Sequence, residues 1–123
     1  MKVLVTGACG FIGFHTCSKL LQQNHIVIGI DNMNDYYDIR IKQNNLTDLK
    51  VYKNFYFYDN DMGTTDMVSR ESPDIIIHLG AYAGVRSSLE KPDLYIENNL
   101  QATCHLLEES VKNKVKLFSV QKI

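Results

Sequence analysis

Three glycines near the start of the chain are spaced as in a turn that binds phosphate. Gly7, Gly10 and Gly13 lie between the apolar run 3–5 and the helical pattern of 14–21. A strand, a glycine turn and a helix in this order let the backbone approach a pyrophosphate, which binds the N–H groups at the positive end of the helix dipole. The pattern predicts a dinucleotide site, although similar turns also close ordinary strand–helix joints.

A carboxylate, Asp31, ends the second apolar run. Its separation from Gly7 is close to the offset of about 20 residues at which dinucleotide sites carry an acidic side chain. A carboxylate there can accept hydrogen bonds from both hydroxyls of an adenine ribose and would repel a 2′-phosphate, which favours NAD over NADP. The alternative is that Asp31 only closes a turn or caps a helix.

The elements that would position these residues alternate between strands and helices. Runs of β-branched residues without polar alternation are typical of strands covered on both faces. They occupy 3–5, 26–30, 55–58, 75–79 and 115–120. A short helix is expected over 66–70, and 32–53 combines a loop with a weaker helical pattern. The alternation predicts an α/β fold with a doubly wound parallel sheet of about five strands, in three layers.

One later helix shows a clear repeat of apolar residues. Leu100, Cys104, Leu107 and Val111 recur at steps of three and four residues. This period places the four side chains on one side of a helix, so the sequence predicts that they form its buried face.

Composition narrows the class of protein. The 123 residues fit one domain, 1–123, with 45% hydrophobic and 22% charged residues. The net charge of −1 argues against nucleic acid or an anionic membrane as the main partner. The 3 cysteines lack the spacing of a disulfide framework or zinc site, and we see neither a signal peptide nor a transmembrane segment. We therefore expect a cytoplasmic protein.

Longer motifs extend the pattern over most of the chain. They are Thr6-Gly7-x-x-Gly10-Phe11-Ile12-Gly13, 31–38 (DNMNDYYD), 77–86 (IHLGAYAGVR), and 88–99 with its Ser-Leu-Glu-Lys-Pro, Tyr95 and Asn99. Together they resemble the extended short-chain dehydrogenase/reductase family, and within it the NAD-dependent nucleotide-sugar epimerases and dehydratases. The chain is most similar to UDP-glucuronate 4-epimerases, from Met1 to about Val115. The resemblance implies a Rossmann-like, NAD(P)-binding domain.

The resemblance also implies roles for individual residues. The pyrophosphate would be lined by Gly7, Gly10, Phe11, Ile12 and Gly13. Asp31 would hold the adenosine ribose with Asn32 and Asn34 nearby, and Asp61 and Met62 would flank the adenine. The segment beside the cofactor would be Leu79, Gly80 and Ala81, where Gly80 departs mildly from the family's usual alanine. Asn99 would lie near the catalytic centre, and Arg86 could approach a sugar carboxylate or the nucleotide phosphates.

Simpler interpretations exist for several of these residues. Asp61 could be a solvated loop carboxylate, Asn99 a polar break in a helix face, and Arg86 an ordinary surface arginine. His78, inside an apolar strand, is better explained as a hydrogen-bonded core histidine than as a catalytic group. Cys9, in the glycine turn, is interpreted as a small filler.

The family's chemistry needs a tyrosine base whose pKa is lowered by a lysine four positions later, because an unperturbed phenol titrates near pH 10. None of the 7 tyrosines is followed by lysine at that spacing. We therefore expect an N-terminal, cofactor-binding portion of an epimerase, truncated and without turnover of its own. One alternative is half of a split enzyme that acts on a UDP-sugar with a complementing chain. The other is a non-catalytic dinucleotide-sensing or interaction module. An uncovered sheet would favour self-association.

Overall fold

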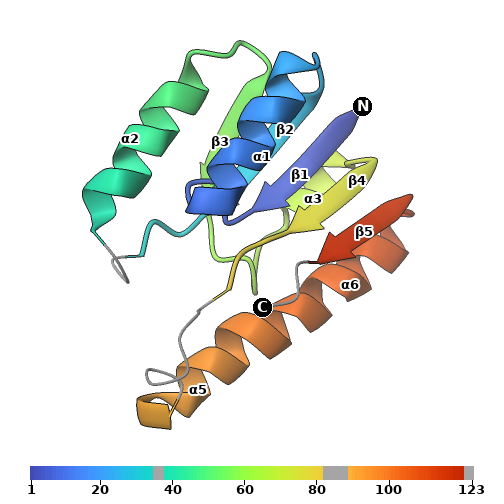
Figure 1. Cartoon of the computed structure of the whole chain (residues 1–123). Helices are drawn as coiled ribbons and strands as arrows, with labels where there is room; N and C mark the ends of the chain where they lie inside the picture. Colours follow the sequence, from blue (N-terminus) through green and yellow to red (C-terminus); the bar gives the residue numbers. More distant parts are fainter. Residues whose placement is uncertain (35–37, 82–88, 121–123) are drawn as a thin grey trace.

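The computed structural model describes residues 1–34, 38–81 and 89–120. Within these ranges five parallel strands form one sheet (Figure 1). The strands are β1 (Lys2–Thr6), β2 (Ile26–Asp31), β3 (Phe55–Asp59), β4 (Ile75–His78) and β5 (Leu117–Val120). Their order, β3-β2-β1-β4-β5, puts β1 in the middle, and the direction of winding reverses between β1 and β4. The predicted doubly wound α/β fold is confirmed.

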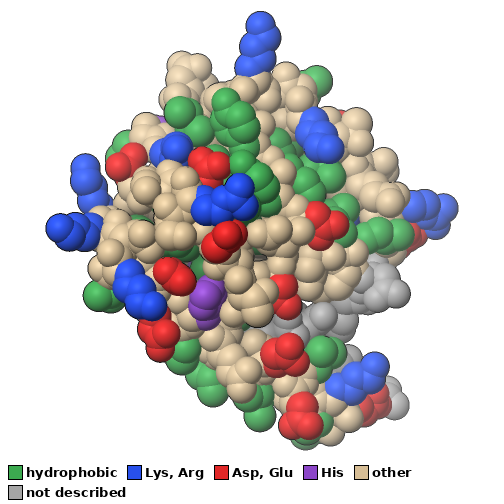
Figure 2. All heavy atoms as spheres, turned by 180° about the vertical axis from the view of Figure 1, so that it is seen from behind, with side chains coloured by type: hydrophobic (Ala, Val, Ile, Leu, Met, Phe, Trp, Pro, Cys, Tyr) green, Lys and Arg blue, Asp and Glu red, His purple; other side chains and the backbone are tan. Residues whose placement is uncertain are grey.

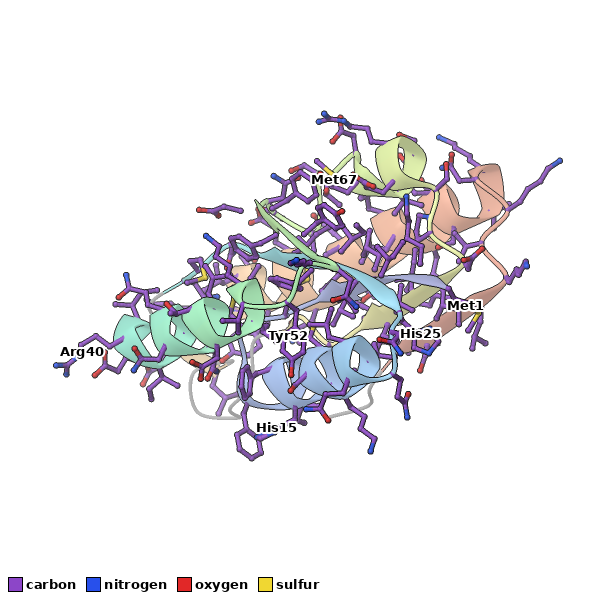
Figure 3. The ribbon with its side chains drawn as sticks, turned by 90° about the horizontal axis from the view of Figure 1, so that it is seen from above. Met1, His15, His25, Arg40, Tyr52 and Met67 are labelled. Carbon is purple, nitrogen blue, oxygen red and sulfur yellow. The ribbon has the colours of Figure 1, made fainter. Side chains whose placement is uncertain are left out.

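Helices cover both faces of the sheet. On one face, α1 (Phe11–Gln22) and α2 (Ile39–Lys50) bury Cys17, Leu21 and Leu49 against the sheet. On the other, α3 (Met67–Glu71) and α6 (Ala102–Lys112) contribute Met67, Val68 and Leu106 to a second apolar cluster. Figure 3 shows the three layers from above, with His15 and Arg40 on one side of the sheet and Met67 on the other.

Local chemistry explains where the helices begin and end. The side chain of Asp38 accepts a hydrogen bond from the N–H of Arg40 and so caps α2. Ser72 follows α3 in the left-handed region, at φ 46°, directly before Pro73. The helix expected within 32–53 is therefore present as α2. The strands have the predicted positions to within two residues at either end.

The helical segment after β4 has three parts. A short α5 (Pro92–Tyr95) continues into a π-helical turn, η1 (Ile96–Gln101), and then into α6. The three run on as one long segment whose first part extends beyond the ends of the strands (Figure 1). Among the described helices, none combines the length and low polarity that crossing a bilayer requires.

The prediction of which face of this last helix is buried is wrong. Cys104 is exposed, as are Leu100, Leu107 and Val111, with exposed fractions of 61%, 44% and 81%. Figure 2 shows hydrophobic side chains along the lower edge of the molecule.

A different stripe of α6 contacts the sheet. It consists of Ala102, Leu106 and Ser110, at steps of four residues. Ala102 and Ser110 are small, and the Ser110 hydroxyl donates to the carbonyl of Leu106 at 2.7 Å, so its polar group is satisfied without reaching the sheet. The buried stripe contains only one large apolar residue, Leu106, so the apolar period pointed to the other side of the helix.

Candidate functional site

The glycine turn lies at the carboxyl end of β1, beside the point where the winding reverses. Gly7 turns the chain at φ 68°, in the left-handed region. A Cβ on Gly7 would lie 2.8 Å from the backbone nitrogen of Gly80, in the segment after β4. A Cβ on Gly13 would overlap the carbonyl oxygen of Gly7. Both positions therefore require glycine, and together they let α1 begin close against the end of β1.

The first turn of α1 exposes backbone donors. Gly10 is the N-cap residue, and in the described part of the chain no side chain caps the helix. The N–H of Gly10 itself donates to the Gly7 carbonyl at 3.1 Å. The first N–H groups of a helix have no partner inside it, and among the described residues those of Phe11, Ile12 and Gly13 donate to no carbonyl outside it. They are left for solvent or an anion.

The Phe11 side chain does not take part in this set of backbone donors. Its ring borders a hollow of about 520 Å³ together with residues of α1 and α2, namely Phe14, His15, Ile41 and Asn45. The contribution of Phe11 to a phosphate site is thus expected from its backbone.

Gly10 differs from its two neighbours in the motif. Its backbone has φ −73° and ψ 177°, an extended conformation that any residue adopts. The fold does not need glycine here for its backbone. What a larger residue would change is the space in front of the N–H groups of α1.

Asp31 lies at the end of β2, and its carboxylate is almost completely covered. Oδ2 accepts from the N–H of Cys9 at 3.1 Å, and Oδ1 from the N–H of Met33 at 2.8 Å. Oδ1 also accepts from Nζ of Lys42, on α2, at 3.0 Å, and these two side chains are only 3% and 7% exposed. A carboxylate offers about four acceptor positions. Three are filled, so one ribose hydroxyl could bind without displacing a donor, rather than two.

Lys42 also connects the loop after β2 to this carboxylate, because its ammonium group donates to both. Its Nζ donates to Oδ1 of Asn34 at 3.1 Å. Asn32 is exposed, and its side chain accepts from the N–H of Asn34 at 3.2 Å. Lys42 was not among the site residues predicted from the sequence, although a lysine one helical turn into α2 is a candidate partner for a carboxylate that ends a buried strand.

Cys9 behaves as the filler that the sequence indicated. Its side chain is fully buried, and burial, together with the nearby Asp31 carboxylate, raises the pKa of its thiol to about 12. The thiol therefore stays protonated at neutral pH, in spite of its place beside the N-terminus of α1.

The segment after β4 approaches the glycine turn closely. The N–H groups of Leu79 and Gly80 both donate to Oγ1 of Thr6, at 3.0 Å each. A Cβ on Gly80 would lie 2.5 Å from Sδ of Met62, which follows β3. Two of the predicted site residues, Met62 and Gly80, thus meet in space. The Gly80 position has room for alanine only if the flexible Met62 side chain moves.

The remaining predicted residues are more scattered. Asp61 is exposed and accepts from the N–H of Gly63 at 2.7 Å, while Ala81 is exposed at the end of a described range. Asn99 lies in η1, where its carbonyl accepts from the hydroxyl of Thr103 at 2.7 Å. Arg86 falls outside the described residues.

Known proteins resemble this chain along its whole length. The sequence is 40% identical to a UDP-glucuronate 4-epimerase from Thermodesulfobacterium geofontis over 124 residues, which is 98% of this chain and 37% of that protein. It is 40% identical to Protein CapI of Staphylococcus aureus over 112 residues, which is 88% of the chain and 33% of that protein. The chain thus spans little more than a third of the length of these relatives.

Solved structures give the same result. The UDP-glucuronic acid 4-epimerase of Bacillus cereus, in complex with UDP-glucuronic acid and NAD, superimposes with a TM-score of 0.88 at 37% identity. That match covers 98% of this chain and 39% of the enzyme. A model of the NAD-dependent epimerase/dehydratase family matches residues 3–121, from the first strand through the last, and the chain therefore belongs to that family.

Proposed function

We propose that this chain is the NAD-binding, N-terminal portion of a nucleotide-sugar 4-epimerase or dehydratase that acts on a substrate like UDP-glucuronate. The observation that carries the proposal is the glycine turn at the reversal of the sheet, where the uncapped start of α1 meets the segment after β4. In doubly wound sheets, ligands bind in the crevice at such a reversal. The similarity to UDP-glucuronate 4-epimerases supports the choice of nucleotide sugar.

The residues present fit NAD. Close packing at Gly7 and Gly13 leaves backbone rather than side chains at the start of α1. The N–H groups of Phe11, Ile12 and Gly13 would then hold the pyrophosphate. Asp31 would accept from a ribose hydroxyl. NAD would supply the hydride acceptor of the family's reaction, and the described residues would bind and orient it.

Turnover of a UDP-sugar is not expected from these 123 residues alone. None of the 7 tyrosines is followed four positions later by lysine, so the chain lacks the phenol base that the family's reaction requires. The alternatives, half of a split epimerase and a dinucleotide-sensing module, share the NAD site and differ in what completes it. A second chain with a Tyr-x-x-x-Lys segment that restored epimerisation would favour the split enzyme.

Gly10→Val tests the phosphate site directly. The extended backbone at Gly10 accepts valine, so we expect the variant to fold. The added side chain would stand in front of the first N–H groups of α1 and should weaken NAD binding by about tenfold or more, the equivalent of at least one hydrogen bond to a charged group. Isothermal titration calorimetry with NAD measures this, after a titration of the unaltered chain.

Gln22→Val is the matched control, because Gln22 is exposed in the last turn of the same helix. It introduces the same β-branched residue far from the turn and should bind NAD as the unaltered chain does. Equal affinity of the Gly10→Val variant, or no NAD binding by the unaltered chain, would contradict the proposal.

Self-association is part of the proposal. The edge strand β5 leaves Leu117 and Val120 exposed, at 56% and 52%, and an unpaired apolar edge favours pairing with another chain. We expect sedimentation velocity to show dimers or larger species whose share grows with concentration. Leu117→Lys should reduce them, whereas Val51→Lys, at an exposed site beyond α2, should not. A monomer at every concentration would contradict this expectation.

A further inference from the structure

A buried histidine links three elements at the site end of the sheet. His78, the last residue of β4, is 3% exposed. Its Nδ1 lies 2.6 Å from Oγ1 of Thr6, at the end of β1, and its Nε2 lies 2.9 Å from Oγ1 of Thr103, on α6. Nothing in the proposed function above uses this side chain.

The first of these contacts fixes the state of Nδ1. Oγ1 of Thr6 already accepts from the N–H groups of Leu79 and Gly80, which occupies both of its lone pairs. The only group it has left is its hydroxyl proton, which must point to Nδ1 of His78. Nδ1 is therefore an acceptor and carries no proton.

The second contact fixes Nε2 independently. The hydroxyl proton of Thr103 is donated to the carbonyl of Asn99, so Oγ1 of Thr103 can only accept from the ring. Nε2 of His78 must therefore carry a proton. The hydrogen bonds to Thr6 and to Thr103 therefore specify the same neutral tautomer of His78. Burial lowers the pKa of His78 to about 4, which agrees with a neutral ring at physiological pH.

The hydrogen bond to Thr6 has a consequence for the segment beside the glycine turn. A threonine hydroxyl can rotate, and its lone pairs stay on two backbone amides only if its proton has a fixed acceptor. His78 is that acceptor. With the Thr6 hydroxyl fixed, Leu79 and Gly80 are held against Gly7, whose N lies 3.3 Å from where a Cβ of Gly80 would be.

We propose that neutral, Nε2-protonated His78 is a positioning residue, which acts through Thr6 to hold the segment 79–81 in the conformation that binds the dinucleotide. The inference rests on the proposed NAD site and adds to it a residue that does not touch the cofactor. The two ring nitrogens have different roles: Nδ1 supports dinucleotide binding through Thr6, and Nε2 holds the ring to α6.

Two substitutions of His78 separate these sides. In His78→Asn, the amide reaches about as far as Nδ1, so its oxygen can accept from Thr6 while the bond to Thr103 is lost. In His78→Gln, the amide reaches about as far as Nε2, so it can donate to Thr103 while the acceptor for Thr6 is lost. Each variant loses one hydrogen bond of the buried ring, so a merely structural histidine predicts similar effects for both.

The experiment is calorimetric titration of the whole chain with NAD, with thermal unfolding measured in parallel. We expect the dissociation constant to stay within about threefold for His78→Asn and to rise about tenfold or more for His78→Gln, the loss typical of one missing hydrogen bond. Ser110→Ala is the control, because it removes another buried hydroxyl from α6 without contacting His78. It should leave NAD affinity unchanged.

The outcomes distinguish this inference from the proposed function. If the unaltered chain binds NAD and both variants lose affinity equally, or neither does, the positioning role is wrong and the NAD site stands. If the unaltered chain does not bind NAD, both are overturned. Should His78→Gln not fold, the ring-nitrogen NMR shifts of the unaltered chain decide: a proton on Nδ1 at neutral pH would overturn the inference, and so would lost NAD affinity in His78→Asn.

Discussion

The Asp31→Ala variant is expected to lose about 3–5 kcal/mol of unfolding free energy, the loss typical when one partner of a buried ion pair is removed. The reason is Lys42, whose side chain is 7% exposed and whose Nζ lies 3.0 Å from the Asp31 carboxylate. Alanine would remove the buried carboxylate that accepts from this buried ammonium group. The N–H groups of Cys9 and Met33 would lose their acceptor as well. Urea unfolding followed by circular dichroism measures the change.

A double variant identifies the cause. Asp31→Ala with Lys42→Met removes both charges, which costs much less than removing one, so about half or more of the lost stability should return. Additive losses in this cycle would contradict the ion-pair explanation.

The same double variant separates stability from binding. Asp31 is also the proposed ribose acceptor, and its loss should weaken NAD binding by about 1–3 kcal/mol. The double variant should therefore regain stability without regaining NAD affinity. Unchanged affinity in either variant would contradict the role of Asp31 in the dinucleotide site.

Gly13→Ala is expected to remove most of the stability of the chain, at least about 4 kcal/mol, which is exceptional for one substitution. A Cβ at this position would overlap the carbonyl oxygen of Gly7. The atoms it would meet belong to the backbone of Gly7 and Ala8 and cannot rotate away. Gly7 is also held at φ 68° with no space on its other side, where Gly80 lies. Relief therefore requires α1 to move away from β1, which would open the apolar cluster beneath it.

Thermal and urea unfolding would show a much lower transition midpoint, or no cooperative transition. Gly63→Ala is the matched control, because the nearest atoms to its Cβ would be Oδ1 of the flexible Asp61 side chain, at 3.2 Å, and Cβ of Ala102, at 3.6 Å. That variant should unfold within about 1 kcal/mol of the unaltered chain. Similar stability of the two variants would show that the start of α1 is less tightly packed than its geometry indicates.

The strands were predictable because their signal is strong and local. Ile26-Val27-Ile28 and Ile75-Ile76-Ile77 are β-branched runs typical of strands covered on both faces, and they lie in β2 and β4, the interior strands on either side of β1. The parallel direction of the strands follows from their alternation with helices. The buried face of α6 was not predictable, because two of its three residues, Ala102 and Ser110, are small and only Leu106 is large and hydrophobic.

The parts of the candidate site that depend on backbone conformation were predictable. The side-chain contacts between elements far apart in the sequence were not. The need for glycine at Gly7 and Gly13 is visible in the spacing of the motif. Lys42 was missed because its partner is set by how α2 packs on β2. Thr6 and His78 are partners in the register of β1 and β4, so knowing the strand order alone would place these two polar residues side by side.

The position of β1 in the sheet has a consequence for how the chain folds as it is made. β1 is made before β2 and β4, the two strands that enclose it in the sheet. Its second neighbour is distant, since Val3 pairs with Ile75. Until β4 has been made, β1 therefore has one open side, and closing that side costs the entropy of ordering the long intervening segment. Pairing between strands so far apart in the sequence is intrinsically slow, and the open side of β1 is exposed to association with other chains in the meantime.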